Sequence, residues 1–179
     1  ISECLVGSEM CIRDSTYTDK AMYDPGDTVK ITVNVNNKSE SKIKSLELQA
    51  MHLNKKVGDK IVTDCNIEAK AKSTRILKWT APDNDFQGYM LEIVAKDENG
   101  TVIDEESVGV DVSSDWRKFP RYGYLCDFSE NAKTYGKVEQ LSKYHINVIE
   151  YYDWHHLHHQ PLAPKEQLDS GVYLSLIHI

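Results

Sequence analysis

The predicted fold rests on the stretch Asn147-Val-Ile-Glu-Tyr-Tyr-Asp-Trp-His-His-Leu-His-His-Gln-Pro-Leu162. An apolar run passes here into an aromatic-acid-aromatic triplet and then into four histidines within five residues. A strand that is buried in a barrel and delivers polar side chains to the barrel mouth has this pattern. We therefore predict a barrel strand over Asn147–Tyr152, followed by residues that face a ligand.

Another strand and a helix are predicted just upstream. Arg121-Tyr-Gly-Tyr-Leu-Cys-Asp127 has the pattern of a strand, and Ser129 is a suitable N-cap for a helix. The helix has one apolar stripe, which contains Ala132, Tyr135, Val138, Leu141 and Tyr144. Strand, helix and strand make a β-α-β unit, which requires a parallel pair with a right-handed crossover. Because a (β/α)8 barrel takes about 250 residues, we predict that residues 114–173 are the truncated start of such a TIM barrel.

Residues 16–113 have an all-β pattern instead. Turns are predicted at Tyr23-Asp-Pro-Gly-Asp27, at the polar run Lys55–Asp59 and at Asp97-Glu-Asn-Gly100. Apolar and polar residues alternate between the turns, and strands are predicted at residues 29–36, 46–50, 61–67, 76–80, 88–96 and 102–112. About seven short strands over about 100 residues are typical of an immunoglobulin-like β-sandwich. Trp79 lies in mid-strand, so we expect it in the core rather than on a sugar-binding surface.

Both ends of the chain have features of translated sequencing-adaptor DNA. Met10-Cys-Ile-Arg-Asp14 can be back-translated into a string whose reverse complement encodes Leu-Ser-Leu-Ile-His, and the chain ends in Leu174-Ser-Leu-Ile-His-Ile179. The alternative is a secretory signal, which needs an apolar core, but three acidic residues interrupt the first 15 positions. We therefore expect residues 1–15 and 174–179 to be adaptor-derived and not native.

The charge balance argues against two classes of partner. The chain has 21 Lys and Arg against 28 Asp and Glu, and residues 16–173 have 20 against 25. A mildly acidic chain without a basic block is not expected to bind nucleic acid or anionic membranes. No apolar run in the sequence is long enough to span a bilayer. Cys65 and Cys126 fall in different predicted domains, with neither a disulfide framework nor zinc-ligand spacing.

Alternation along the predicted barrel strand separates its two carboxylates. Glu150, Tyr152 and Trp154 share one face, whereas Ile149, Tyr151 and Asp153 share the other. We expect Ile149 and Tyr151 to face the barrel helices, which places Glu150 and Tyr152 inside. Glu150 and Asp153 then point in opposite directions, whereas the two carboxyls of a retaining glycosidase lie about 5–5.5 Å apart. Three roles stay open for Glu150: a buried ion pair with Lys or Arg, a hydrogen bond to a sugar, or catalysis.

The run His155-His-Leu-His-His159 suggests a metal site, because His155 and His159 have i, i+4 spacing. However, the run follows a strand end, Pro161 lies close behind, and no Cys or Glu stands at a matching offset. We predict no metal and no cofactor, and we expect the histidines either to hydrogen-bond sugar hydroxyls or to lie in a solvated loop. Tyr152 and Trp154 have rings that can stack on a pyranose, with core packing as the alternative for Trp154.

Three separated motifs support a more specific prediction. They are Val110-Asp-Val-Ser-Ser-Asp-Trp-Arg-Lys-Phe-Pro-Arg-Tyr-Gly-Tyr124, Leu141-Ser-Lys-Tyr-His-Ile-Asn147 and Tyr152-Asp-Trp-His-His-Leu-His-His-Gln-Pro-Leu162. In this order and spacing they resemble glycoside hydrolase family 66, which contains endo-dextranases and cycloisomaltooligosaccharide glucanotransferases. The segments 23–27 and 79–89 are similar to the immunoglobulin-like domain of that family, so the resemblance covers about residues 16–173.

The resemblance implies a retaining enzyme, secreted or held at the bacterial cell surface, that acts on α-1,6-glucan such as dextran. An α-glucan polysaccharide is therefore the expected partner. The Asp nucleophile and the Glu acid/base of the family lie on later barrel strands, so this chain is expected to contain no catalytic residue and to be inactive by itself. Substrate-binding roles are implied for Glu150, Tyr152, Asp153, Trp154 and His159. The family pattern favours Gln at the position of Glu150.

Two other functions are compatible with the sequence. One is a carbohydrate-binding or adhesive immunoglobulin-like protein, and the other is a barrel glycosidase for another glycan. The choice between dextranase and cyclising glucanotransferase depends on loops and modules outside this sequence, so both activities stay open.

Overall fold

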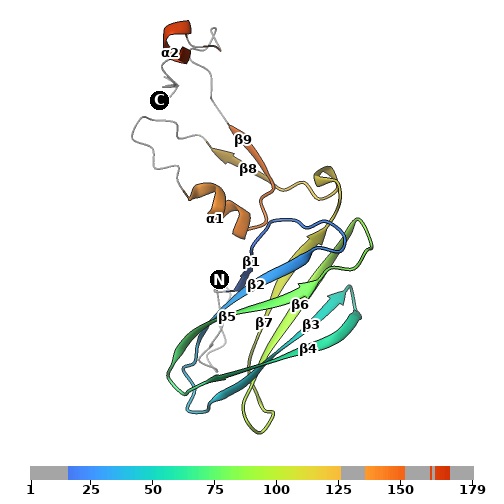
Figure 1. The fold of residues 1–179 in the computed structure, drawn as a ribbon, viewed down its shortest axis with the longest axis vertical. Helices are drawn as coiled ribbons and strands as arrows, with labels where there is room; N and C mark the ends of the chain where they lie inside the picture. The colour runs from blue at the N-terminus through green and yellow to red at the C-terminus, as the bar shows by residue number, and fades with distance from the viewer. Residues whose placement is uncertain (1–15, 126–135, 152–161, 163, 170–179) are drawn as a thin grey trace, which may run out of the picture. The chain divides into compact units, whose positions relative to one another are not determined.

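The computed structural model describes residues 16–125, 136–151, 162 and 164–169. The chain divides into two compact units, Ile1–Phe119 and Pro120–Ile179. The described residues form three sheets, and each sheet lies within one unit (Figure 1).

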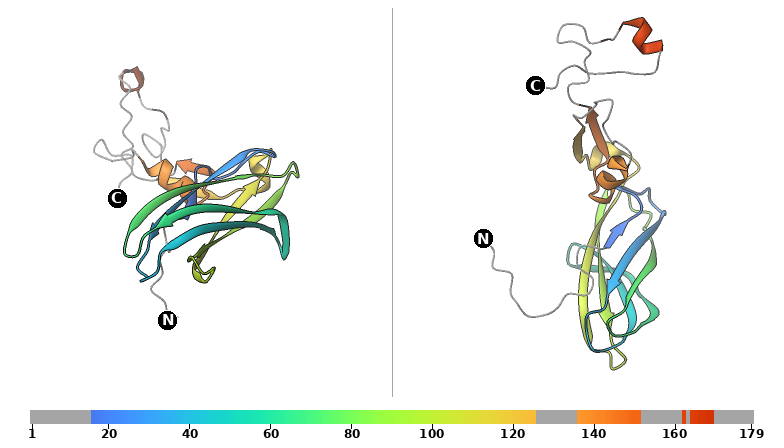
Figure 2. Two further views of the ribbon diagram at one scale, coloured as in Figure 1. Left: turned by 60° about the horizontal axis from the view of Figure 1, so that its bottom comes forward. Right: turned by 90° about the vertical axis from the view of Figure 1, so that its left-hand side faces the viewer.

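The first unit contains seven strands in its described part. Their bounds are β1 Thr16–Thr18, β2 Thr28–Asn36, β3 Ile43–His52, β4 Lys55–Ile67, β5 Lys72–Thr80, β6 Gln87–Lys96 and β7 Val102–Val112. They form two antiparallel sheets with the strand orders β1-β2-β5 and β4-β3-β6-β7, which pack face to face (Figure 2). A short 3-10 helix, η1 (Trp116–Lys118), follows β7. The predicted all-β domain is therefore confirmed.

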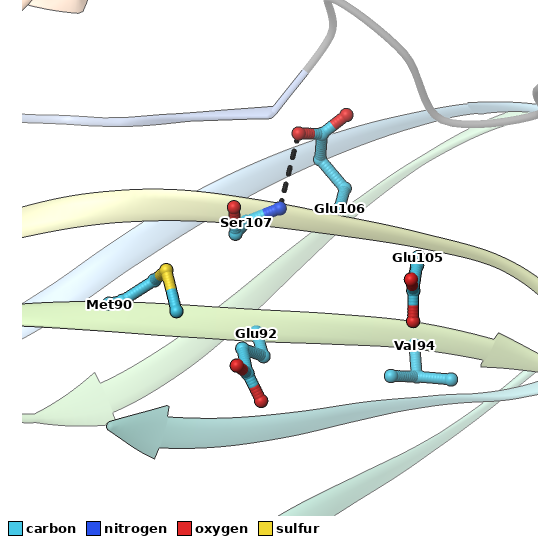
Figure 3. Close-up of a pocket in the computed structure, with 6 residues that line it drawn as sticks. All are labelled: Met90, Glu92, Val94, Glu105, Glu106 and Ser107. Carbon is cyan, nitrogen blue, oxygen red and sulfur yellow. Dashed lines mark hydrogen bonds between the residues drawn. The ribbon is translucent and has the colours of Figure 1, made fainter. Parts of the chain in front are cut away.

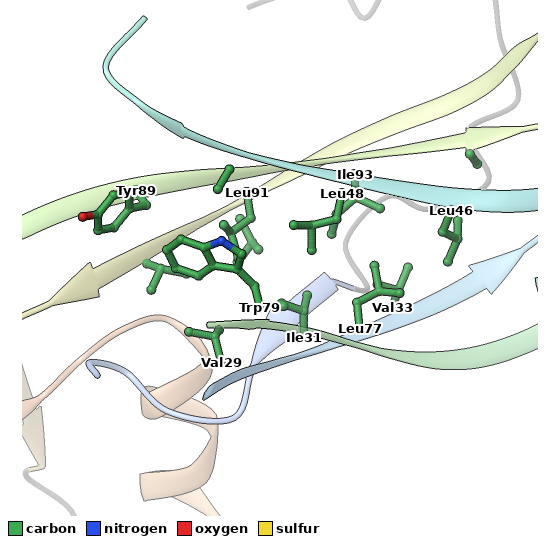
Figure 4. Packing of buried hydrophobic residues seen from close by; sticks show 14 of the residues in the cluster. Val29, Ile31, Val33, Leu46, Leu48, Leu77, Trp79, Tyr89, Leu91 and Ile93 are labelled. Atoms are coloured by element: carbon green, nitrogen blue, oxygen red, sulfur yellow. The ribbon is translucent and has the colours of Figure 1, made fainter. Parts of the chain in front are cut away.

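The core lies between the two sheets and is built from alternate residues of the strands. In β2, every second residue from Val29 to Val35 is buried, and the residues between them are not. Figure 4 shows side chains of β2 and β5 pointing toward those of β3 and β6. A slip of one residue in strand register would move such a set to the solvent face. Because each large apolar side chain contributes about 1.5–3 kcal/mol when it is buried, the alternation selects one register.

Trp79 belongs to this core. Its side chain is 7% exposed, and its ring meets that of Tyr89 edge to face at a centroid distance of 5.2 Å. The prediction that Trp79 is a core residue is therefore confirmed.

The predicted turn at Lys55–Asp59 is wrong, because these residues begin β4. The hairpin between β3 and β4 turns instead at Leu53 and Asn54. Leu53 has a φ of 53° and is 82% exposed, so an apolar residue occupies a left-handed position that turns usually give to Gly or Asn. Gly58 suggested a turn, but it lies within β4, where the register with β3 shifts opposite Gln49. Its φ of 65° belongs to this irregularity.

The predicted turn at Tyr23–Asp27 is confirmed, and it also ties the beginning of the sandwich to its last strand. Gly26 has a φ of 79°, a left-handed conformation that several β-turns require and that favours glycine. Tyr23 forms a parallel bridge with Val112. Its buried hydroxyl donates a hydrogen bond to the Asp19 carboxylate at 2.6 Å. Burial, followed by this hydrogen bond, raises the pKa of the Tyr23 phenol.

The second unit contains a parallel strand pair. Its described elements are β8 (Tyr122–Leu125), α1 (Lys137–Lys143), β9 (Val148–Tyr151) and α2 (Lys165–Asp169). β8 and β9 pair in parallel, with Tyr122 opposite Val148 and Tyr124 opposite Glu150. Asn147 fixes the start of this pair, because its Oδ1 accepts a hydrogen bond from the Arg121 N–H at 3.0 Å. The predicted parallel pairing of these two strands is confirmed.

The predicted helix is described only in its second half. Gly136, with a φ of 82°, directly precedes α1. The predicted N-cap Ser129 lies outside the described residues, as do Ala132 and Tyr135 of the apolar stripe. Of the other stripe positions, Leu141 is partly buried, whereas Val138 and Tyr144 are 54% and 78% exposed.

Candidate functional site

The predicted substrate site belongs to the β8-α1-β9 unit. Gly123 shows which face of its two strands is turned toward α1. This residue is buried, and a Cβ added to it would lie 2.8 Å from Ile146 Cγ2 and 3.7 Å from Leu141 Cδ2. The missing side chain therefore lets α1 and the residue Ile146 approach this face of β8. Paired residues of neighbouring strands share a face, so Gly123 and its partner Ile149 form the face toward α1.

The opposite face of the strand pair carries two tyrosines and a carboxylate. Tyr122 and Tyr124 are 56% and 62% exposed. Glu150 is also exposed and lies next to Tyr124 in the register. A carboxylate accepts hydrogen bonds, and phenol rings offer an apolar body with a polar tip. This combination of side chains suits the binding of a sugar.

The structure describes one of the five residues predicted to bind substrate, Glu150. The other four, Tyr152, Asp153, Trp154 and His159, lie outside the described residues. Glu150 lies on the face away from α1, in agreement with its predicted separation from Ile149. Glu150 is exposed, and its three possible roles stay open. The sequence patterns did not single out Tyr122 and Tyr124, although their alternation around Gly123 and the parallel register identify them.

The sandwich has an open surface depression on the outer face of β6 and β7 (Figure 3). It has a volume of about 330 Å³ and is lined by Met90, Glu92, Val94, Glu105, Glu106 and Ser107. Three of these six residues are acidic and none is aromatic. Sites for small molecules are usually enclosed and mostly apolar. The depression is therefore a poor candidate for the substrate site.

A carboxylate between two lysines lies on the outer face of the same sheet. Glu47 Oε2 is 2.7 Å from Lys60 Nζ and 2.9 Å from Lys96 Nζ. The Glu47 side chain is only 16% exposed. The hydrogen bond from Lys60, followed by that from Lys96, lowers the pKa of Glu47 despite partial burial. One carboxylate thus connects β4, β3 and β6.

We expect Glu47 to make the free energy of unfolding depend on pH. Because its folded-state pKa is lowered, its stabilising contribution is present above the unfolded pKa of about 4.3 and is lost as the pH falls through the folded-state pKa. Glu47→Gln should therefore destabilise the protein by roughly 0.5–1 kcal/mol at neutral pH. It should also flatten the decrease of the urea midpoint on acidification. Glu98→Gln, at an exposed hairpin position, is the control, and coincident pH profiles for Glu47→Gln and wild type would refute the expectation.

Metal and thiol chemistry find little support in the described part of the chain. No group of three or more His, Cys, Asp or Glu side chains there could hold a metal ion. The histidine run 155–159 and Cys126 lie outside the described residues. Cys65 is a buried free cysteine, and burial raises the pKa of its thiol, as in a packing residue rather than a nucleophile.

Among the described helices, none has the length and apolar character needed to cross a membrane.

Known proteins resemble this chain over part or most of its length. The family model described as glycosyl hydrolase family 66 matches residues 18–178. A cycloisomaltooligosaccharide glucanotransferase of Niallia circulans is 36% identical over 146 residues, which are 79% of this chain and 14% of that protein. A dextranase of Streptococcus salivarius is 31% identical over 75 residues, which are 37% of this chain and 9% of that protein.

A solved structure gives the same result. The crystal structure of a Paenibacillus sp. cycloisomaltooligosaccharide glucanotransferase complexed with cycloisomaltoheptaose matches with a TM-score of 0.72 and 31% identity. The match covers 87% of this chain and 22% of that one. Among the curated relatives, the chain spans 14% of the length of two Niallia circulans glucanotransferases. The range matched by the family model includes the three sequence motifs quoted above, and the chain belongs to glycoside hydrolase family 66.

Proposed function

We propose that this chain is part of a retaining glycoside hydrolase or transglycosylase that acts on α-1,6-glucan such as dextran. The observation that carries the proposal is the family match over residues 18–178, which is supported by relatives named as a glucanotransferase and a dextranase. An α-glucan polysaccharide is the proposed partner. We propose that the protein is secreted or attached to a bacterial cell surface, because such a polymer occurs outside the cell.

In this proposal residues 16–113 are an immunoglobulin-like scaffold and residues 114–173 begin a (β/α)8 catalytic barrel. Residues 1–15 and 174–179 are proposed to be adaptor-derived. The two antiparallel sheets support the scaffold role, since such sandwiches mainly provide a rigid frame. The parallel pair β8 and β9, with α1 between them in the chain, supports the barrel, because strand-helix-strand is its repeating unit.

Residues 147–162 are proposed to form one wall of the substrate cleft. The helices of a (β/α)8 barrel lie outside its strands. The face toward α1, with Gly123, would then be the outer face, and Glu150 and Tyr124 would point into the barrel. Both residues lie near the carboxyl ends of their strands, where the active sites of such barrels are found. We therefore add Tyr124 to the proposed substrate-binding residues, which are Glu150, Tyr152, Asp153, Trp154 and His159.

Hydrolysis assays test the proposal. The complete enzyme, which includes the later barrel strands, should release sugar from dextran but not from pullulan or xylan. The 179-residue chain, assayed in parallel, should release none, because the nucleophile and the acid/base are expected on strands that it does not contain. Activity on xylan or pullulan without activity on dextran would refute the proposed substrate. Turnover by the 179-residue chain would refute the proposed placement of the catalytic carboxylates.

A further inference from the structure

One carboxylate, that of Asp85, holds both a strained turn and the segment that leaves the sandwich. Its Oδ1 accepts hydrogen bonds from the Phe86 N–H at 2.9 Å and from the Ser114 N–H at 2.8 Å. Its Oδ2 accepts a hydrogen bond from the Ser114 hydroxyl. Desolvation acts to raise the pKa of Asp85, but the hydrogen bonds from Ser114 and Phe86 outweigh it and lower the pKa. Asp85 therefore acts as an ionised acceptor.

Phe86 gives the turn a second contact with the same segment. Its φ of 59° is rare for an aromatic residue and is strained. Lys118 Nζ lies 4.9 Å from the centroid of the Phe86 ring, within the range of a cation–π contact. We call Ser114–Lys118 the connector. The turn contacts both of its ends, Ser114 through Asp85 and Lys118 through Phe86.

The connector is also ordered internally. Ser113 is fully buried, its N–H donates to the Tyr23 carbonyl at 2.8 Å, and its hydroxyl donates to the Asp115 carbonyl at 2.7 Å. The Asp115 carboxylate caps η1 by accepting a hydrogen bond from the Arg117 N–H at 3.0 Å. The Arg117 side chain lowers the pKa of Asp115 to about 2. These hydrogen bonds restrict the backbone of the connector, so few further contacts are needed to fix it.

We propose that Asp85 and Phe86 form a clamp that locks the connector to the sandwich. The connector then belongs to the first unit as far as Lys118. The division of the chain between Phe119 and Pro120 supports this proposal. The domain boundary predicted from the sequence, after Ser113, lies before the clamp. The clamp does not depend on the proposed enzymatic function.

Amide hydrogen exchange on the whole 179-residue chain tests the clamp. In Asp85→Ala the amide of Ser114 should exchange at least about tenfold faster, because its opening no longer has to break the hydrogen bond to Asp85. The amide of Lys118, which donates to the Asp115 carbonyl, should also exchange faster, because the connector is released as a whole. The amide of Ile93, in the core of β6, should keep its wild-type exchange rate. Asp85→Asn should restore most of the protection, since its Oδ1 can still accept both N–H groups.

The hairpin residue Asp97 offers a matched control. Its carboxylate also accepts two backbone hydrogen bonds, from Asn99 at 2.9 Å and from Thr101 at 2.8 Å. Asp97→Ala should leave the exchange of the connector amides unchanged. Wild-type exchange at Ser114 in Asp85→Ala would overturn the proposal. Equal acceleration at Ser114 and Ile93 would overturn it as well, because it would indicate general loss of stability.

Phe86→Gly separates the ring from the carboxylate, and it can be measured even if Asp85→Ala does not fold. Glycine adopts a positive φ without strain, so the turn should persist. Exchange at Lys118 should accelerate because the ring contact is lost, whereas Ser114 should stay protected by Asp85. Wild-type exchange at Lys118 would show that the ring takes no part in the clamp and would overturn this half of the proposal.

Discussion

Trp79→Ala is expected to lower the free energy of unfolding by about 3–5 kcal/mol. The indole is 7% exposed and lies between the two sheets, so its removal leaves a cavity that rigid strands cannot close (Figure 4). The edge-to-face contact with Tyr89, at a centroid distance of 5.2 Å, is lost as well. Urea unfolding followed by circular dichroism should show a lower midpoint with an unchanged slope.

Ile76→Ala is the matched control for this prediction. Ile76 lies in the same strand, β5, but is 61% exposed. Truncation of such a surface residue is expected to change the unfolding free energy by no more than about 0.5 kcal/mol. If the two variants have the same midpoint, Trp79 is not the core residue that its burial indicates.

Asn37→Ala is expected to cost about 2–4 kcal/mol, although the residue lies in a loop. Asn37 is completely buried, and its Nδ2 donates to the carbonyls of Ser41 at 2.9 Å and Glu68 at 3.0 Å. Its Oδ1 accepts hydrogen bonds from the N–H and the hydroxyl of Ser39. Alanine would leave several of these backbone groups without a partner where water cannot easily reach them. Thermal and urea unfolding measure the loss.

Two further variants make the Asn37 prediction sharper. Asn37→Asp keeps the shape of the side chain but replaces the donor with an acceptor that faces carbonyl oxygens, so it should be no more stable than Asn37→Ala. Asn99→Ala removes an exposed asparagine from a hairpin and should have little effect. A wild-type midpoint for Asn37→Asp would mean that the Nδ2 hydrogen bonds contribute nothing to stability.

Much of the sandwich could be predicted from local patterns. Burial of every second residue, as in Val29–Val35, produces an alternation that is visible in the sequence because a strand has a period of two. The position of Trp79 in such a run predicted its burial correctly. The parallel pairing of β8 and β9 followed from a helix pattern between two strand patterns. The family followed from three motifs, and the family match over residues 18–178 confirms it.

The misplaced turn shows where local patterns fail. Lys55–Asp59 is polar and contains Gly58, as turns often do, yet it pairs with β3 as part of β4. Leu53 has no turn propensity, yet it takes a φ of 53°. The pairing of two long strands fixed the position of the turn, and the resulting tertiary contacts outweighed the local preference of one leucine.

By itself, the sequence determined that the first unit is all-β and that the second contains a parallel strand pair. It also determined the core faces of the strands and the family. Those features depend on residues that are close together in the chain, or on motifs that can be recognised without contacts. The tertiary structure alone decided that Asn37 donates a hydrogen bond to the carbonyl of Glu68, 31 positions away. It alone decided that Asp85 accepts one from Ser114, 29 positions away. It also decided that Tyr124 is the neighbour of Glu150 in the parallel strand pair. A hydrogen bond or a shared face between distant segments exists only once the strands have paired, and no local periodicity encodes it.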